Sequence, residues 1–180
     1  AVSHYKMMEA GFKNEIEECV KNQKLMAVTE LQLRRQQKGD EFDLAGDTET
    51  TETAKPVIIV DKLDSVKSAI QHRDGKTAVL NFASYKNPGG KFMEGSSAQE
   101  ECLCHASTLY NVLKQLPVYY QWNRMHNNRA LYTNRALYSE DVIFIDDSVC
   151  VYGAEPEQVK IDVITCATPN FSSSWKIRKG

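Results

Sequence analysis

Four short segments rich in β-branched and other apolar residues stand out along this chain. They are Val57–Val60, Ala78–Phe82, Val142–Ile145 and Val163–Ala167, and the stretches between them are long enough to hold helices. Short apolar runs bounded by polar residues are typical of buried strands, and strands that alternate with helices are typical of an α/β fold. We therefore expect an α/β domain whose sheet contains these four strands.

Other stretches have the spacing of amphipathic helices. Apolar residues recur at loose helical intervals through Phe12–Lys38, which predicts one long helix or two shorter ones. A short helix is expected over Asp64–His72, with Asp64 as its N-cap, and a longer one over Ser97–Leu116. The segment Gly39–Pro56 is acidic, rich in threonine and closed by proline, so we expect a mobile loop there.

Composition narrows the class of protein. With 180 residues, of which 42% are hydrophobic, the chain is large enough for one ordinary domain with a core. Its net charge of -2 and its pI near 6.1 give no basic surface for wrapping nucleic acid or binding an anionic membrane. Its apolar runs fall far short of the roughly 20 residues that span a bilayer.

The five cysteines are an odd number without the spacing of a disulfide framework, which favours reduced thiols and a cytoplasmic location. Cys102 and Cys104 lie about 200° apart around a helix axis, so both cannot bind one metal ion from a helix. We expect no metal site.

The most informative stretch is Ala78–Ser107, where an expected strand runs through a glycine-containing loop into an expected helix. Ligands of open α/β sheets bind beyond the carboxyl ends of the strands, and a loop without side chains lets the backbone approach a phosphate or sugar closely. Gly89 and Gly90 provide such a loop. Because Lys91 is followed by Phe92, the loop is not a nucleotide-triphosphate P-loop.

The helix after this loop begins with Gln99, Glu100 and Glu101, for which two interpretations stand. Ser97 and Glu100 have the spacing of a capping box, and acidic residues stabilise the start of a helix. Alternatively, one of the adjacent carboxylates faces the ligand side and acts as a general acid, which requires a raised pKa.

These residues resemble a known family. The similar strings are Asn81-Phe-Ala-Ser, Asn87-Pro-Gly-Gly and Gly95-Ser-Ser-Ala-Gln-Glu-Glu101, followed by Ser107-Thr-Leu-Tyr110, with supporting segments at Tyr138–Phe144 and Asp162–Asn170. They resemble the signature of the bacterial-type poly(ADP-ribose) glycohydrolases, which are built on a macrodomain. The resemblance runs from about Val57 to Asn170, and its most specific element is the glycine pair followed by Gln-Glu-Glu.

The resemblance implies a three-layer α/β/α macrodomain-like fold with a mixed sheet, incomplete at the C-terminus of this chain. Residues 1–56 would form an N-terminal helical segment with the acidic loop, and residues 57–180 the catalytic region. Glu101 would be the general acid that protonates the leaving oxygen and then, as a carboxylate, activates water, while Glu100 would hold ribose hydroxyls. The remaining implied substrate contacts are Gln99, Asn81, Ser84 and Asn87 around the ribose, with the Gly89 and Gly90 backbone against the diphosphate.

The implied activity is hydrolysis of ADP-ribose glycosidic linkages, most simply in poly(ADP-ribose), without a cofactor. ADP-ribosylated protein or nucleic acid would be the acceptor, and no membrane would be involved. The alternatives are a non-catalytic ADP-ribose-binding macrodomain and an inert fragment. Both alternatives stay open because the family's third glycine is Lys91 here and no second cluster of glycines follows. We expect the chain to be the N-terminal part of a longer protein, completed by a second polypeptide, by dimerisation, or not at all.

Overall fold

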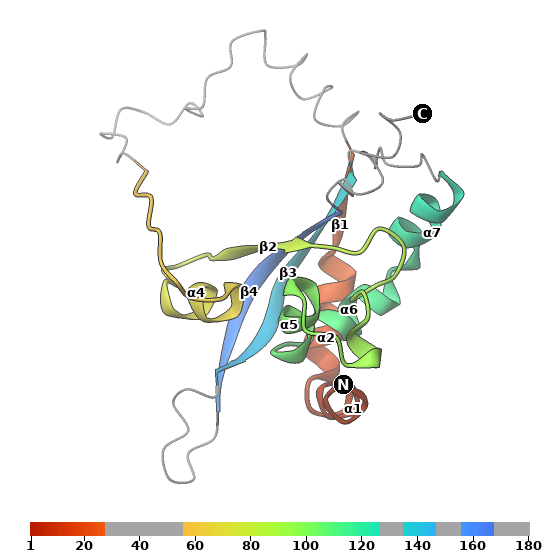
Figure 1. Cartoon of the computed structure of the whole chain (residues 1–180). Helices are drawn as coiled ribbons and strands as arrows, with labels where there is room; N and C mark the ends of the chain where they lie inside the picture. Colours follow the sequence, from red (N-terminus) through yellow and green to blue (C-terminus); the bar gives the residue numbers. More distant parts are fainter. Residues whose placement is uncertain (28–55, 127–134, 147–155, 168–180) are drawn as a thin grey trace, which may run out of the picture.

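A computed structural model of the chain describes residues 1–27, 56–126, 135–146 and 156–167. Its sheet has four strands in the order β1-β3-β4-β2, namely β1 (Lys24–Ala27), β2 (Ala78–Phe82), β3 (Arg135–Asp146) and β4 (Glu157–Cys166) (Figure 1). β1 and β4 both pair antiparallel with β3, while β2 pairs parallel with β4. The expected α/β class with a mixed sheet is thereby confirmed.

The helices of the described residues are short. They are α1 (Val2–Gly11), α2 (Lys13–Asn22), α4 (Ser65–Gln71), α5 (Gln99–His105), α6 (Leu109–Gln115) and α7 (Pro117–Met125), with a 3₁₀ turn η1 at Phe92–Glu94. α4 confirms the expected short helix, and Asp64 caps it by accepting a hydrogen bond from the Lys67 amide at 2.9 Å. None of these helices has the length and apolar character needed to cross a membrane.

The single helix expected over Ser97–Leu116 is wrong, because the chain breaks between α5 and α6. The Thr108 amide donates to the carbonyl of Ile143 in β3 at 2.9 Å, and the Ser107 hydroxyl donates to the Leu103 carbonyl at 2.7 Å. The backbone at 107–108 therefore bonds to a strand far away in sequence rather than continuing a helix. Such a long-range bond is invisible in helical spacing.

The helical expectation for Phe12–Lys38 holds only as far as α2. From Lys24 the chain is a strand, since Leu25 pairs with Leu137 of β3. The remainder of that range and almost all of the expected loop Gly39–Pro56 lie outside the described residues. α2 and β1 thus pack into the same sheet and core as the residues after 56.

Three of the four expected strands are present and one is not. β2 has the expected bounds. β3 extends beyond Val142–Ile145 at both ends, and β4 overlaps Val163–Ala167 but begins earlier, at Glu157. The expectation of a strand at Val57–Val60 is wrong, because these side chains are 63–90% exposed and no described strand pairs with them. An apolar β-rich run forms a strand only when a neighbour supplies its hydrogen bonds.

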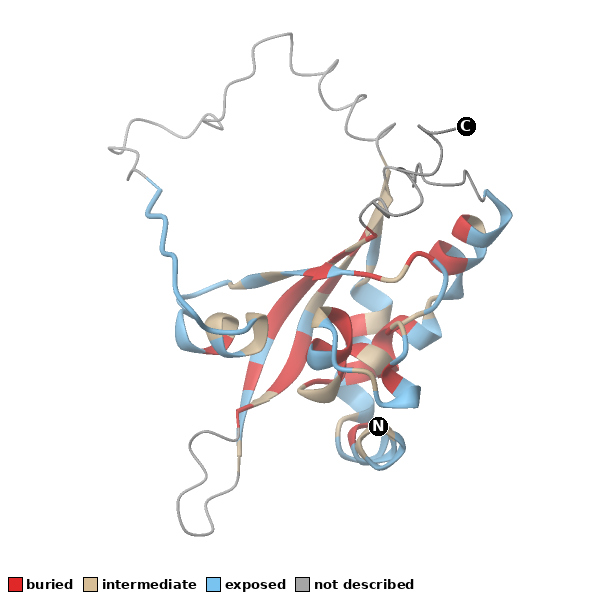
Figure 2. Ribbon diagram, viewed as in Figure 1, coloured by how far each residue is buried: buried red, intermediate tan, exposed pale blue. Residues whose placement is uncertain are grey.

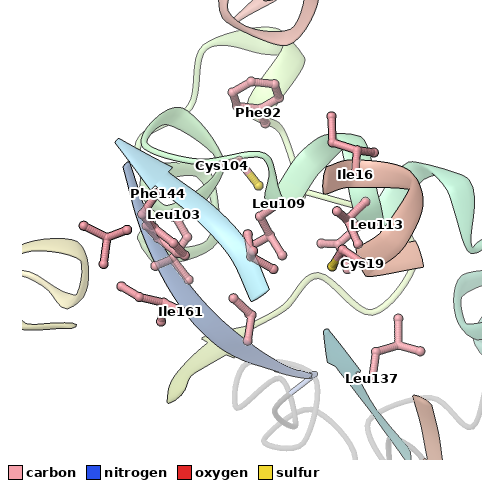
Figure 3. Close-up of a cluster of buried hydrophobic side chains, with 14 of the residues drawn as sticks. Ile16, Cys19, Phe92, Leu103, Cys104, Leu109, Leu113, Leu137, Phe144 and Ile161 are labelled. Carbon is pink, nitrogen blue, oxygen red and sulfur yellow. The ribbon is translucent and has the colours of Figure 1, made fainter. Parts of the chain in front are cut away.

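The core lies on one face of the sheet, under the helices (Figure 2). Figure 3 shows Leu103 of α5 beside the strand residues Phe144 and Ile161, and Ile16 and Cys19 of α2 beside Leu113 of α6, all within one hydrophobic cluster. On β2, Val79 packs toward this core, so Leu80 and Phe82 project from the other face, where they are 44% and 52% exposed. The second helical layer of the expected three-layer fold is not among the described residues.

Candidate active site

The candidate site lies where β2 ends and α5 begins. After Phe82 the chain runs through residues 83–98 and returns to the start of α5 beside the strand (Figure 1). α5 follows Ala98, whose extended backbone makes it the N-cap, and both Glu100 and Glu101 fall in its first turn. We call these two residues the carboxylate pair, and residues 87–91 the glycine loop.

Glu100 is held by the chain that leaves β2. Only 4% of its surface is exposed, and one carboxylate oxygen accepts a hydrogen bond from the Ser84 amide at 2.7 Å. Its other oxygen lies 3.4 Å from the side-chain amide nitrogen of the fully buried Asn81. The capping-box interpretation is therefore wrong, because Ala98 and not Ser97 is the N-cap and Glu100 bonds to Ser84 and Asn81 instead.

Burial raises the pKa of Glu100 from 4.5 to about 7. The Ser84, Asn81 and Gly89 hydrogen bonds favour the charged form and act against this shift, whereas the nearby charge of Glu101 adds to it. A carboxyl group in this position changes its protonation near neutral pH. That is the property required of a group that exchanges protons during a reaction.

This raised pKa predicts that stability falls as pH rises. The folded state binds the Glu100 proton more tightly than the unfolded state does, so its stabilising effect is complete below about pH 4.5 and is lost as pH rises through about 7. We expect Glu100→Gln to match the wild-type free energy of unfolding near pH 4 and to exceed it at pH 8, by at most about 3 kcal/mol.

Chemical denaturation at the two pH values measures this difference, with Glu17→Gln, exposed on α2, as the matched control. The control should stay within about 0.5 kcal/mol of the wild-type free energy of unfolding at both values, because Glu17 makes only an exposed pair with Lys13 at 4.0 Å. An equal gain for Glu100→Gln at both pH values would show that Glu100 keeps an ordinary pKa in the folded protein.

Glu101 is held by the glycine loop through one carboxylate oxygen, and its other oxygen has no hydrogen-bond partner among the described residues. It is 6% exposed, and its Oε1 accepts a hydrogen bond from the Lys91 amide at 2.8 Å. Its Oε2 is buried and has no hydrogen-bond partner within the described part of the chain. A buried acceptor without a partner is costly, so this oxygen is the one best placed to receive a proton or a ligand group.

Gly90 allows the loop to approach the carboxylate pair. Its φ of +58° lies in the left-handed region, and a Cβ there would overlap Glu101 Oε1 and stand 3.0 Å from Glu100 Oε2. Gly89, with φ of +66°, must also be glycine, because a ring carbon of Tyr110 would lie 2.6 Å from an added Cβ. The glycine pair is needed for contact of the loop with helices α5 and α6, which spacing alone did not reveal.

Lys91 fits the loop in place of a third glycine. Its φ of -107° and ψ of 28° are open to any residue, its side chain is exposed, and its amide makes the bond to Glu101. Lys91 departs from the family's third glycine, and its backbone contact with Glu101 could not be predicted, because backbone donors carry no signal in residue type.

The structure brings most of the expected site residues together. Asn81 and Ser84 contact Glu100, and Gly90 lies against both carboxylates. Asn87 is exposed and accepts a hydrogen bond from Arg124 at 3.4 Å, away from the pair. Gln99 contacts the backbone of β2.

One residue near this site was not anticipated. Thr165, opposite Asn81 on the neighbouring strand β4, accepts a hydrogen bond from the Asn81 side-chain amide at 3.3 Å. Among the described residues, no three histidine, cysteine, aspartate or glutamate side chains are grouped to hold a metal ion.

Comparisons with known proteins identify the family and the fold. The family model described as microbial-type PARG, catalytic domain, where PARG is poly(ADP-ribose) glycohydrolase, matches residues 3–147. The solved structure of PARG from Thermomonospora curvata superposes with a TM-score of 0.79 at 23% identity, covering 98% of this chain and 65% of that chain. No curated protein sequence matches the chain significantly.

PARG from Deinococcus radiodurans, solved in complex with ADP-ribose, is also similar. One crystal form gives a TM-score of 0.61 at 28% identity over 91% of this chain and 61% of that chain. Another gives 0.53 at 35% identity over 64% of this chain and 46% of that chain. The chain thus spans less than two thirds of the length of each of these structures.

Proposed function

Because the chain belongs to the family of microbial-type PARG catalytic domains, we propose that it hydrolyses the glycosidic bond of ADP-ribose units, with poly(ADP-ribose) as its substrate. One observation carries the proposal most directly. A buried pair of carboxylates lies under a glycine loop, and one of its oxygens, Glu101 Oε2, has no partner in the described chain. Solved relatives that bind ADP-ribose support the choice of ligand.

In this proposal Glu101 is the general acid and base. Its protonated carboxyl donates the proton to the oxygen that links two riboses, and the bond between that oxygen and the anomeric carbon breaks. The resulting carboxylate then takes a proton from a water molecule that adds to the anomeric carbon, which restores the acid. Glu101 is assigned this role because both oxygens of Glu100 already accept protein hydrogen bonds.

Glu100 orients the ribose in this scheme and is partly protonated near neutral pH. Since its pKa is about 7, Glu100 is about half protonated at pH 7, which lessens the repulsion between its charge and that of the adjacent buried carboxylate. A substrate that covers the carboxylate pair would exclude water from it. Asn81 and Ser84 hold Glu100 in place for this role.

The remaining elements of the proposal concern the substrate and its surroundings. The backbone of Gly89 and Gly90 is the proposed contact for the diphosphate, with the exposed Asn87 at the rim. ADP-ribosylated protein or nucleic acid is the proposed acceptor, meaning the molecule that carries the ADP-ribose chain. No cofactor takes part in the proposed reaction. The odd number of cysteines favours a location in the cytoplasm. We propose residues 57–180 as the catalytic region.

The proposal is tested by two measurements on the 180-residue chain. Titration calorimetry with ADP-ribose, with AMP as the control ligand, measures binding, and chromatography of a reaction with purified poly(ADP-ribose) measures released ADP-ribose. We expect saturable binding together with release. Binding without release would identify a non-catalytic ADP-ribose reader, and the absence of both would mean that the chain alone is inert.

A further inference from the structure

Gln99, the residue before the carboxylate pair, forms hydrogen bonds to the backbone of β2 with both the oxygen and the nitrogen of its side-chain amide. Its Oε1 accepts a hydrogen bond from the Phe82 amide at 2.9 Å, and its Nε2 donates to the Leu80 carbonyl at 2.8 Å. The same nitrogen lies 3.4 Å from the Ser65 hydroxyl of α4. Both ends of the amide therefore have partners within the protein.

These two peptide groups belong to the outer edge of β2. Toward β4, the strand uses the Thr77 carbonyl, which accepts from Asp162, and the Ala83 amide, which donates to Cys166. Because alternate residues face opposite edges of a strand, Leu80 and Phe82 direct their peptide groups away from β4, where no described strand pairs with them.

The two bonds copy those of a neighbouring parallel strand. In a parallel ladder, one residue donates to the carbonyl before the residue opposite it and accepts from the amide after that residue. Gln99 does both around Asn81, so its side chain takes the place of one residue of a neighbouring strand at that point. The bonds satisfy two backbone groups at an otherwise open strand edge.

This contact links the two sides of the candidate site. Asn81, which lies between the two bonded peptide groups, contacts Glu100, and Gln99 directly precedes Glu100 in the first turn of α5. The bonds therefore fix the start of α5 against the end of β2. From the same first turn of α5, Glu100 accepts a hydrogen bond from the Ser84 amide and Glu101 accepts one from the Lys91 amide.

We propose that Gln99 is a positioning residue that holds the carboxylate pair in register with β2, rather than a contact for the ribose. The inference rests on the proposed function for its kinetic consequences. Its structural part, the clamp on β2, can be tested without turnover. Loss of the clamp displaces Glu100 and Glu101, so it lowers kcat much more than it weakens the binding of ADP-ribose.

The experiment compares Gln99→Met, which keeps the length of the side chain and removes its hydrogen bonds, with Gln121→Met, exposed on α7, as the matched control. For Gln99→Met we expect amide hydrogen exchange at Phe82 to rise about tenfold or more. We expect kcat to fall by about 10–100-fold, with the ADP-ribose Kd within about threefold of the wild-type value. The control should change none of these quantities.

A second variant, Gln99→Glu, separates positioning from loss of fold. It keeps the acceptor for the Phe82 amide but loses the donor to Leu80 whenever its carboxyl group is charged. Its kcat relative to wild type should therefore rise as pH falls from about 8 to about 5, because protonation restores the donor.

Three results would overturn the proposal. They are unchanged exchange at Phe82, an unchanged kcat in Gln99→Met, and a loss of ADP-ribose affinity larger than the loss of kcat, which would identify a direct ribose contact. If wild-type protein releases no ADP-ribose, the proposed function fails, while the exchange at Phe82 still decides whether the clamp exists.

Discussion

Replacing Glu101 by glutamine is expected to lower the rate of ADP-ribose release about 10³-fold, because general acid and base catalysis of this kind contributes about 10²–10⁴. Glutamine has the same shape and can still accept the hydrogen bond from the Lys91 amide, so the loop should remain in place. What it cannot do is give a proton to the leaving oxygen or take one from water. The binding of ADP-ribose should therefore stay within about threefold of wild type.

Initial rates with poly(ADP-ribose), together with calorimetric titration of ADP-ribose, check this expectation. Glu17→Gln, on the exposed surface of α2, is the matched control and should be indistinguishable from wild type in both. An unchanged rate in Glu101→Gln would show that the proton is carried by another group. A 10³-fold loss confined to Glu100→Gln would assign the role to that residue, whose pKa is the raised one.

Replacing Gly90 by alanine is expected to damage both stability and turnover. An L-residue at φ of +58° is strained by about 1–2 kcal/mol, and the added Cβ overlaps Glu101 Oε1. Either the loop or Glu101 must move, so the bond from the Lys91 amide is weakened. We expect a destabilisation of about 2–4 kcal/mol and a loss of turnover of at least about 100-fold.

Gly75→Ala provides a matched control for this substitution. Gly75 has nearly the same φ, +57°, but nothing lies within 4 Å of an added Cβ. It should therefore show the backbone strain alone, about 1–2 kcal/mol, with normal turnover at a temperature where both variants are folded. Thermal denaturation and initial rates measure the two effects. Equal losses in the two variants would mean that contact between Gly90 and the carboxylates has no special role.

Those parts of the fold that depend on local sequence could be predicted. The apolar run of β2 and the Asp64 cap of α4 are local signals, and both elements formed as expected. Parts that depend on distant partners could not. Val57–Val60 has the composition of a strand but no described neighbour, and Thr108 interrupts a helical pattern because its amide bonds to β3.

The candidate site shows the same division. The adjacent carboxylates and the glycine pair could be identified from residue types, since both are written directly in the sequence. Which carboxylate is fully bonded could not, because the donors are the backbone amides of Ser84 and Lys91 and their positions depend on the folded loop. The contact of Gln99 with β2 was hidden for the same reason.

The central claim is that ADP-ribose binds against the carboxylate pair beneath the glycine loop. Amide chemical-shift mapping of the labelled 180-residue chain during titration with ADP-ribose tests it most directly. We predict saturable shifts concentrated at Ser84, at Gly89–Lys91, and at Glu100 and Glu101. Shifts confined to other elements, such as α1 and α2, or no shifts at saturating ADP-ribose, would contradict the claim.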